Sequence, residues 1–348
     1  MTRCFTAIVL AVVAIVGLTG CGGEEKAPKD VVLITHDSFA ISKPVRAAFE
    51  RETGLKLRIL QSGDAGEALN KALLTAGNPQ GDVFFGVDNN LLTRALDHDL
   101  FEPYTPPELA HVPRDFVLDS EHRVTPIDHG EVCLNYDKAW FSKHHLRPPE
   151  SFEDLAELRY DKLLVVENPA TSTPGLAFLL ATVAHFGFEG WQDYWRELKA
   201  NGVLVVDGWE EAYTVRFSGS SGKGKRPIVV SYASSPPAEV VFAGKALKEA
   251  PTAVVPSTCF RQVELAGVLR GARNEEGARK LIDFMLTPTF QRDVPLAMFV
   301  FPVRDGVRLP KVFAKYAVVP KSPLDLPPNV IGSNRDAWIR EWTGIVLH

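Results

Sequence analysis

The sequence predicts an α/β fold in which short strands alternate with amphipathic helices. Short apolar stretches at 31–34, 57–60, 83–85, 163–166, 203–206 and 228–230 are typical of buried strands. Helices are expected between and after them, at 42–53, 69–76, 91–96, 174–186, 191–198, 209–217 and 278–285. Alternation of this kind favours parallel sheets with helices on both faces.

Local signals support individual helices. Apolar residues from Leu69 to Ala76 recur on one helical face, and Gly77 follows them. Pro44 lies in the first turn of the helix expected at 42–53, and Gly54 lies just past its end. Because ligands of parallel α/β sheets bind beyond the carboxyl ends of the strands, the polar segments that follow the strands are the places to look for a site.

Five polar segments follow expected strands, at 35–39, 61–66, 86–90, 167–175 and 231–236. Their hydroxyl, amide and carboxylate groups could together bind one small polar ligand. The same residue types are preferred helix N-caps, and Asp64 with Glu67 fits a capping box, so capping and ligand binding remain alternatives for each segment. Trp209 and Tyr213, four residues apart on one helical face, fit either a core pair or a stacking surface.

The N-terminus has the pattern of an export signal. Arg3 precedes an uncharged, mostly apolar run at 5–18, which is too short for a membrane-spanning helix. The run ends in Leu-Thr-Gly-Cys at 18–21, which resembles the cleavage box of bacterial lipoproteins. We therefore expect a signal peptide at 1–20, lipidation of Cys21 and a polar tether at 21–30, which would anchor an exported protein on the outer face of the cytoplasmic membrane. An ordinary signal peptide with an incidental cysteine is the alternative.

Composition and motifs argue against several classes of protein. A length of 348 residues suggests about two domains, and a net charge of -5 without a long basic stretch argues against a nucleic-acid partner. The sequence has no phosphate-binding or dinucleotide-binding glycine motif and no nucleophile elbow. Asp128 and His129 are adjacent, so on a strand they would face opposite sides and form no catalytic dyad. Since no cysteine and histidine spacing fits a metal site either, we expect neither an enzyme nor a resident metal or cofactor.

Five stretches of the sequence resemble the thiamine-binding proteins of bacterial ABC importers. They are THDSF at 35–39, VDNNLL at 87–92, TSTPG at 171–175, GWEEAY at 208–213 and SYASSP at 231–236, in the same order and with similar spacing. The likeness continues from about Val31 to WIREW at 338–342. The resemblance implies the type II periplasmic-binding-protein fold, related to iron- and polyamine-binding proteins. In that fold two lobes, each a mainly parallel sheet flanked by helices, enclose a ligand cleft.

The resemblance also implies a domain organisation. Lobe 1 would comprise 31–125 plus about 266–310, lobe 2 would comprise 126–265, and a helical segment at 311–348 would pack across both lobes. The chain would cross between the lobes near 126–128 and 262–264. Cys133 and Cys259 lie close to these crossings, and we expect them on neighbouring strands of lobe 2, joined by a disulfide.

The ligand implied by the resemblance is thiamine or a thiamine phosphate, delivered by a monomeric receptor to an ABC permease. The thiazolium cation favours carboxylates and aromatic faces in its site. Residues 62–66 and 171–173 would hold the hydroxyethyl or phosphate end. The expected ligand-binding residues are His36, Asp37, Ser38, Gly63, Asp64, Ala65, Asp88, Asn89, Asp128, Thr171, Ser172, Thr173, Trp209, Tyr213, Tyr232, Ser234 and Phe299.

The chain also departs from this family. His36 and His129 stand where members carry tyrosine, Phe299 stands where they carry tryptophan, and a tyrosine near Ala238 is absent. Other solutes on the same fold, namely Fe(III), a polyamine or a phosphorylated organic compound, therefore remain alternatives, although the tyrosine pair of ferric receptors is missing. An exported hydrolase is a further alternative. A protonated His36 would repel a cation, which predicts weaker thiamine binding at about pH 5 than at about pH 7.5.

Overall fold

The computed structural model describes residues 28–220, 224–243 and 247–348. Its strands are β1 (Asp30–Thr35), β2 (Lys56–Gln61), β3 (Val83–Asp88), β4 (Phe101–Glu102), β5 (Thr125–Asp137), β6 (Leu164–Glu167), β7 (Leu204–Val206), β8 (Ile228–Tyr232), β9 (Thr252–Leu269) and β10 (Phe301–Pro302). Its α-helices are α1 (Lys43–Thr53), α2 (Ala65–Leu74), α3 (Leu92–Asp97), α4 (Lys138–His144), α5 (Thr173–Phe186), α6 (Trp191–Ala200), α7 (Ser235–Phe242), α8 (Glu275–Met285), α9 (Pro288–Ala297), α10 (Lys311–Tyr316) and α11 (Pro328–Val346). Glu211–Arg216 forms a π-helical turn, and short 3-10 helices lie at Pro107–His111, Arg114–Phe116, Glu153–Ala156 and Leu158–Tyr160.

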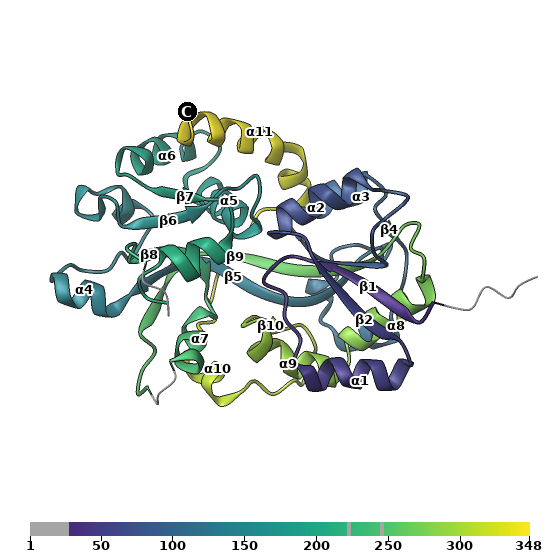
Figure 1. The fold of residues 1–348 in the computed structure, drawn as a ribbon. Helices are drawn as coiled ribbons and strands as arrows, with labels where there is room; N and C mark the ends of the chain where they lie inside the picture. The colour runs from purple at the N-terminus through teal and green to yellow at the C-terminus, as the bar shows by residue number, and fades with distance from the viewer. Residues whose placement is uncertain (1–27, 221–223, 244–246) are drawn as a thin grey trace, which may run out of the picture.

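The strands form one sheet in the order β2-β1-β3-β9-β5-β8-β6-β7. The pairs β1–β2, β1–β3, β6–β7 and β6–β8 are parallel, as the alternation of strands and helices predicted. The middle of the sheet is antiparallel, because β9 pairs with β3 and β5, and β5 pairs with β8. Figure 1 shows β5 and β9 running across the molecule, with β1–β3 at one end and β6–β8 at the other. We refer to these ends as the β1–β3 half and the β6–β8 half.

Apolar periodicity did not predict the two long central strands, although the resemblance implied neighbouring strands at Cys133 and Cys259. The two-residue strands β4 and β10 were not predicted either. Within β5 the polar run from Asp128 to Glu131 interrupts the apolar pattern, and within β9 Pro256 and Ser257 do the same. Both strands also carry irregular pairing, between Pro126 and Asp128 and between Val132 and Leu134. Such bulges shift the alternation of side chains and so remove the simple period-two signal.

The helix signals correspond to the structure at α1 and α2. Pro44 lies in the first turn of α1, and Gly54 closes it in the left-handed conformation with φ of 72°. Asp64 is the N-cap of α2, and its side chain accepts the backbone N–H of Ala65. Glycine is favoured at the end of α1 because it adopts positive φ without a steric cost.

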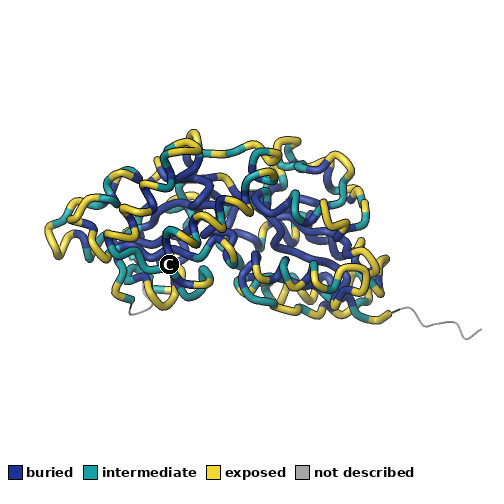
Figure 2. Tube along the Cα trace, turned by 90° about the horizontal axis from the view of Figure 1, so that it is seen from above, coloured by how far each residue is buried: buried dark blue, intermediate teal, exposed yellow. Residues whose placement is uncertain are grey.

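Buried residues, coloured dark blue in Figure 2, extend through both halves, and most of them are apolar. α11 lies over α6 and α3, so the C-terminal helix contacts elements of both halves (Figure 1). Trp342 of α11 meets Trp195 of α6 edge-on, with ring centroids 5.3 Å apart. Burial of such aromatic surface stabilises the docking of α11.

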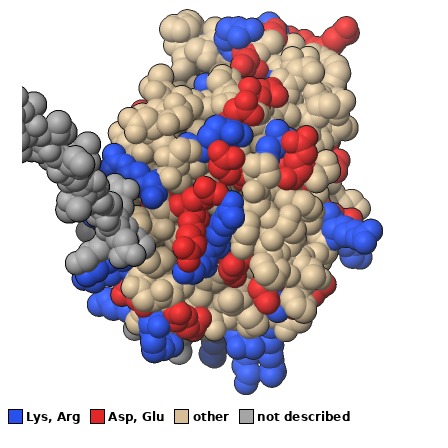
Figure 3. Space-filling view, turned by 90° about the vertical axis from the view of Figure 1, so that its right-hand side faces the viewer, with Lys and Arg blue, Asp and Glu red and all other residues tan. Residues whose placement is uncertain are grey.

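Figure 3 shows acidic and basic side chains interleaved over the face of the β1–β3 half. Several form ion pairs, such as Arg58 with Asp30 at 3.1 Å and Lys280 with Glu276 at 2.6 Å. These pairs are exposed, so each contributes little to stability.

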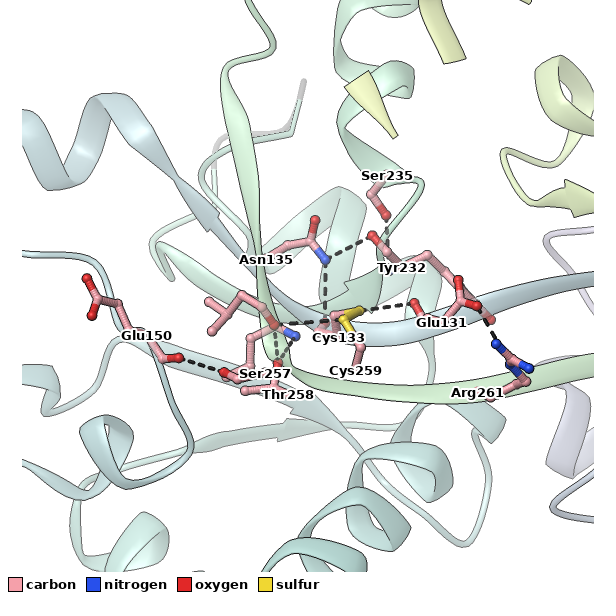
Figure 4. The surroundings of a disulfide bond; sticks show 12 residues. Glu131, Cys133, Asn135, Glu150, Tyr232, Ser235, Ser257, Thr258, Cys259 and Arg261 are labelled. Carbon is pink, nitrogen blue, oxygen red and sulfur yellow. Dashed lines mark hydrogen bonds and ion pairs between the residues drawn. A yellow bond between two sulfur atoms is a disulfide. The ribbon is translucent and has the colours of Figure 1, made fainter. Parts of the chain in front are cut away.

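A disulfide joins Cys133 of β5 to Cys259 of β9 within the sheet (Figure 4). Both cysteines are buried. Cys133 lies opposite Ser231 of β8, and Asn135 donates a side-chain hydrogen bond to the carbonyl oxygen of Tyr232 at 3.1 Å. The cross-link therefore lies on the strand next to the end of β8 in the sheet.

The expected signal peptide at 1–20, the lipidated Cys21 and most of the tether lie outside the described residues. In the described ranges, no helix combines the length and the apolar character that a membrane crossing needs.

Candidate functional site

A cavity of about 470 Å³ lies among the ends of β1 and β8, the middle of β9, the N-termini of α2 and α5, the π-helical turn, α7 and the segment after α9. Its lining residues therefore come from both halves of the molecule. They are His36, Asp37, Ser38, Phe39, Ala40, Asp64, Ala65, Thr173, Pro174, Trp209, Glu210, Tyr213, Thr214, Ser220, Tyr232, Ser235, Ala238, Glu239, Phe242, Glu264, Ala297, Met298, Phe299 and Val300.

Aromatic rings form one side of the cavity. Trp209 and Tyr213 stack with centroids 5.0 Å apart and planes 14° apart, and Tyr232 meets Trp209 edge-on at 6.3 Å. The indole N–H of Trp209 donates to Ser231 Oγ at 2.9 Å, which fixes the ring. The pair is thus packed against its neighbours and also lines the cavity. Such faces suit a flat or cationic ligand.

The carboxylate of Asp64 connects the two halves beside this wall. Its Oδ1 accepts the N–H of Ala65 at 2.7 Å and that of Thr173 at 3.2 Å, and its Oδ2 accepts the N–H of Trp209 at 3.0 Å. Asp64 therefore satisfies backbone donors at three helix starts, which would otherwise lack intrahelical partners. Burial raises the pKa of Asp64, while the hydrogen bond from Trp209 opposes that rise.

Other contacts join the halves at the same edge of the cavity. Ser38 Oγ donates to Glu210 Oε1 at 3.1 Å, and Glu67 N–H donates to the carbonyl oxygen of Thr171 at 3.0 Å. Gly66 is required there, because a Cβ at that position would lie 2.6 Å from Thr171 O.

His36 pairs with Glu264 at the base of the cavity, with Nε2 3.3 Å from Oε1. Burial alone would lower the pKa of His36, but the Glu264 carboxylate raises it, and the net shift is upward. Asp128 lies beside Glu264, and its pKa is raised by burial and then by the charge of Glu264. Glu264 offsets the charge of a protonated His36, a pairing that the sequence analysis did not include.

Several expected ligand residues line the cavity. They are His36, Asp37, Ser38, Asp64, Ala65, Thr173, Trp209, Tyr213, Tyr232 and Phe299. The others lie near it without lining it: Gly63, Asp88, Asn89, Asp128, Thr171, Ser172 and Ser234.

Most of the second group have structural partners. Asp88 is fully buried and accepts hydrogen bonds from Asn90, Leu91 and Gln262, and burial raises its pKa to about 7. Asn89 exchanges hydrogen bonds with the backbone of β9, and Thr171 Oγ1 donates to Asp207 O at 2.6 Å. In the structure these three side chains therefore cap or brace neighbouring backbone segments.

Gly63, Ser172, Ser234 and Asp128 are close neighbours of the lining residues. Gly63 has φ of 92° in the turn before α2, and its carbonyl oxygen accepts the N–H of Asp37 at 2.9 Å. Ser172 and Ser234 are buried immediately before α5 and α7. These positions shape the turns from which the lining residues project.

Sequence reasoning missed several lining residues, notably Glu210, Glu239, Phe242 and Glu264. Glu210 lies within the GWEEAY stretch, next to Trp209. The helical spacing of Ser235, Glu239 and Phe242 was the signal that could have identified the cavity face of α7. Glu264 lies on β9, which apolar periodicity did not predict.

The described lining of the cavity is acidic and aromatic. It carries the carboxyl groups of Asp37, Asp64, Glu210, Glu239 and Glu264 and no lysine or arginine. Within the described residues no group of three or more His, Cys, Asp or Glu is arranged to hold a metal ion. The arrangement is suited to binding a small organic cation between aromatic faces.

Known proteins resemble the chain over most of its length. It is 32% identical to the thiamine-binding periplasmic protein of Salmonella typhimurium, over 92% of this chain and 95% of that protein. It is 31% identical to the thiamine-binding periplasmic protein of Escherichia coli, over 90% of this chain and 92% of that protein.

Solved structures agree with these relatives. A periplasmic thiamin binding protein superposes with a TM-score of 0.79 at 29% identity, over 93% of this chain and 98% of that chain. The apo ferric ion-binding protein A of Pasteurella haemolytica shares the fold, with a TM-score of 0.70 at 16% identity, over 91% of this chain and 98% of that chain. These neighbours place the chain in the type II periplasmic-binding-protein fold. The model of the bacterial extracellular solute-binding proteins matches residues 78–335, and the chain therefore belongs to that family.

Proposed function

We propose that this protein is the extracytoplasmic receptor that delivers thiamine, or a thiamine phosphate, to an ABC importer. The observation that carries the proposal is the cavity between the halves, where the Trp209–Tyr213 stack faces a lining rich in carboxylates. A thiazolium cation and an aminopyrimidine ring match this combination of charge and aromatic surface. Relatives at 32% and 31% identity are named thiamine-binding periplasmic proteins, which supports the same ligand.

The same proposal includes a hinge. Lobe 1 would comprise 31–125 with about 266–310, lobe 2 would comprise 126–265, and 311–348 would pack across both. β5 and β9 run through both halves, so bending of these two strands would open the cavity. Asp64, with its bonds to Thr173 and Trp209, would hold the closed form. Hinge closure around a ligand is a common motion of such two-lobed receptors.

The proposal also covers location and class. A signal peptide at 1–20 and acylation of Cys21 would place a monomeric receptor on the outer face of the cytoplasmic membrane, close to its permease. We infer a binding protein rather than an enzyme, since its relatives are named as binding proteins.

The test is ligand identification followed by titration. Native mass spectrometry of the protein purified from rich medium should reveal a bound thiamine compound, since a buried cavity releases its ligand slowly. Calorimetry of the stripped protein should then give one site for thiamine. Spermidine, ferric citrate and a sugar phosphate serve as competitors. Tighter binding of any of them than of thiamine would show that thiamine is not the preferred ligand.

A further inference from the structure

Helix α7 presents one continuous face to the cavity. Ser235, Ala238, Glu239 and Phe242 all line it, at the i, i+3, i+4 and i+7 spacing of a single helical face. The small side chain of Ala238 leaves room on this face, and Phe242 lies one turn further along the helix. The face therefore offers a carboxyl group and an aromatic ring side by side.

We propose that α7 carries the specificity-determining residues of this site, with Glu239 as the counter-charge for a permanently cationic ring and Phe242 as the aromatic wall that covers that ring. This inference rests on the proposed function and deepens it.

Glu239 is held in place within the cavity. Only 9% of its surface is exposed, and its Oε1 accepts the hydroxyl of Tyr213 at 2.8 Å. Burial raises the pKa of Glu239, while the hydrogen bond from Tyr213 opposes the rise. The upward direction means that desolvation of the carboxylate outweighs its hydrogen bond from Tyr213, and an adjacent cation would offset that cost.

The other carboxylates of the lining already have partners. Asp64 accepts three backbone N–H groups, and Glu264 lies 3.3 Å from His36. Glu210 accepts the hydroxyl of Ser38. Asp37 is exposed to solvent, where a charge attracts a ligand weakly. Glu210 is only partly buried, so Glu239 is the buried carboxylate of the described lining whose hydrogen-bond partner is a neutral hydroxyl.

Phe242 extends the aromatic surface across the mouth of the cavity. It is 65% exposed, which is high for a large apolar side chain that lines a cavity. Its ring meets that of Phe299 with centroids 5.3 Å apart and planes 56° apart. Figure 1 places α7 in the β6–β8 half, while Phe299 follows α9 in the other half, so the two rings meet across the opening.

Phe299 is held toward this opening by its backbone. Its φ of 56° is a left-handed conformation, which is uncommon for a bulky residue and tends to occur at functional sites. Together, Phe242 and Phe299 would lie against one face of a ring whose positive charge points to Glu239.

The test compares thiamine with 3-deazathiamine, a neutral isostere in which carbon replaces the charged ring nitrogen. Calorimetry is done on the wild type, Glu239→Gln and Phe242→Leu, with Glu276→Gln and Val241→Ala as controls. Glu276 lies on α8 in an exposed ion pair, and Val241 lies on α7 outside the cavity lining. Thermal unfolding confirms that each variant folds.

We expect Glu239→Gln to weaken thiamine binding by about tenfold or more while changing 3-deazathiamine binding by less than about threefold. Phe242→Leu should weaken thiamine binding by about 2- to 30-fold, with a smaller effect on the neutral isostere. Both controls should match the wild type. If both variants weaken the two compounds equally, or weaken neither, the inference is wrong while the receptor function stands. If the wild type binds neither compound, the proposed function is wrong and the inference falls with it.

Discussion

Asp64 Oδ2 accepts the backbone N–H of Trp209 at 3.0 Å, although the two residues lie 145 positions apart in the chain. This bond joins the start of α2 in one half to the start of the π-helical turn in the other. It also places the indole of Trp209 against the cavity. A single carboxylate thereby combines helix capping, contact between the halves and positioning of the aromatic wall.

Replacing Asp64 tests this combination. Asp64→Ala should lower the free energy of unfolding by about 1–3 kcal/mol, because buried N–H groups lose a charged acceptor. Ligand affinity should fall as well, because the closed form loses its bonds to Thr173 and Trp209. Denaturant unfolding and calorimetry measure the two effects.

Asp137→Ala is the matched control for Asp64. Asp137 is an equally buried N-cap, at α4 and outside the cavity lining. It should lose a similar amount of stability and keep its ligand affinity. Equal loss of affinity in both variants would show that Asp64 acts through stability alone.

The close approach of the halves at Gly66 gives a steric prediction. In Gly66→Ala the new Cβ would lie 2.6 Å from the carbonyl oxygen of Thr171, so one backbone must move. Overpacking of this kind costs about 1–3 kcal/mol, which should appear as weaker ligand binding and a wider solution structure by small-angle scattering. Gly344→Ala on α11 is the control, since a Cβ there meets no atom within 4 Å. An unchanged affinity in Gly66→Ala would mean that the ligand-bound form does not need this contact.

The disulfide predicts a stability effect. Cys133 and Cys259 are 126 residues apart, so their bond closes a long loop in the unfolded chain. The double variant Cys133→Ala, Cys259→Ala should lose about 2–5 kcal/mol of unfolding free energy. Alkylation without reductant should leave the mass of the mature wild type unchanged. Two modified thiols in the folded, unreduced protein would contradict the pairing.

Ligand binding should weaken as the pH falls from about 7.5 to about 5. Burial raises the pKa of Glu239, so its carboxyl group gains a proton at a higher pH than an ordinary glutamate does, and the protonated group no longer attracts a cation. Tyr213, its hydrogen-bond partner, stays neutral because burial raises its pKa further.

Because His36 is paired with Glu264, we attribute this pH dependence to Glu239 rather than to His36. In both cases binding weakens as the pH falls. The pKa of His36 is raised and that of Glu264 is lowered, so both remain charged over much of the range and their charges offset each other. Calorimetry at the two pH values should therefore show a smaller pH effect in Glu239→Gln than in the wild type. An undiminished effect in that variant would return the role to His36.

The sequence predicted those parts of the fold that have strong local signals. The strands of both parallel ends and most of their helices have apolar periodicity, and the caps at Asp64 and Gly54 are visible as residue types. Periodicity missed β5 and β9 because polar residues, a proline and bulged pairing interrupt their pattern, and only the resemblance pointed to strands at Cys133 and Cys259. The strands that pair with β5 and β9 are also distant in sequence, and no local residue pattern indicates such pairing.

The same limit applies to the site. Residues in the segments after the strands could be named from sequence, and many of them line the cavity, including Asp37, Trp209 and Tyr232. Glu239 and Phe242 were not named, because helix α7 itself was not predicted and its cavity face depends on how it packs. The interlocking contacts of Asp64 depend on tertiary structure, which no local pattern encodes.

Calorimetric titration of the ligand-free protein with thiamine tests its proposed role as a thiamine receptor most directly. We expect saturable binding of one thiamine per chain, accompanied by quenching of tryptophan fluorescence because Trp209 lines the cavity. Absence of binding at millimolar thiamine, or binding that leaves the fluorescence unchanged and persists in Trp209→Leu, would contradict this role.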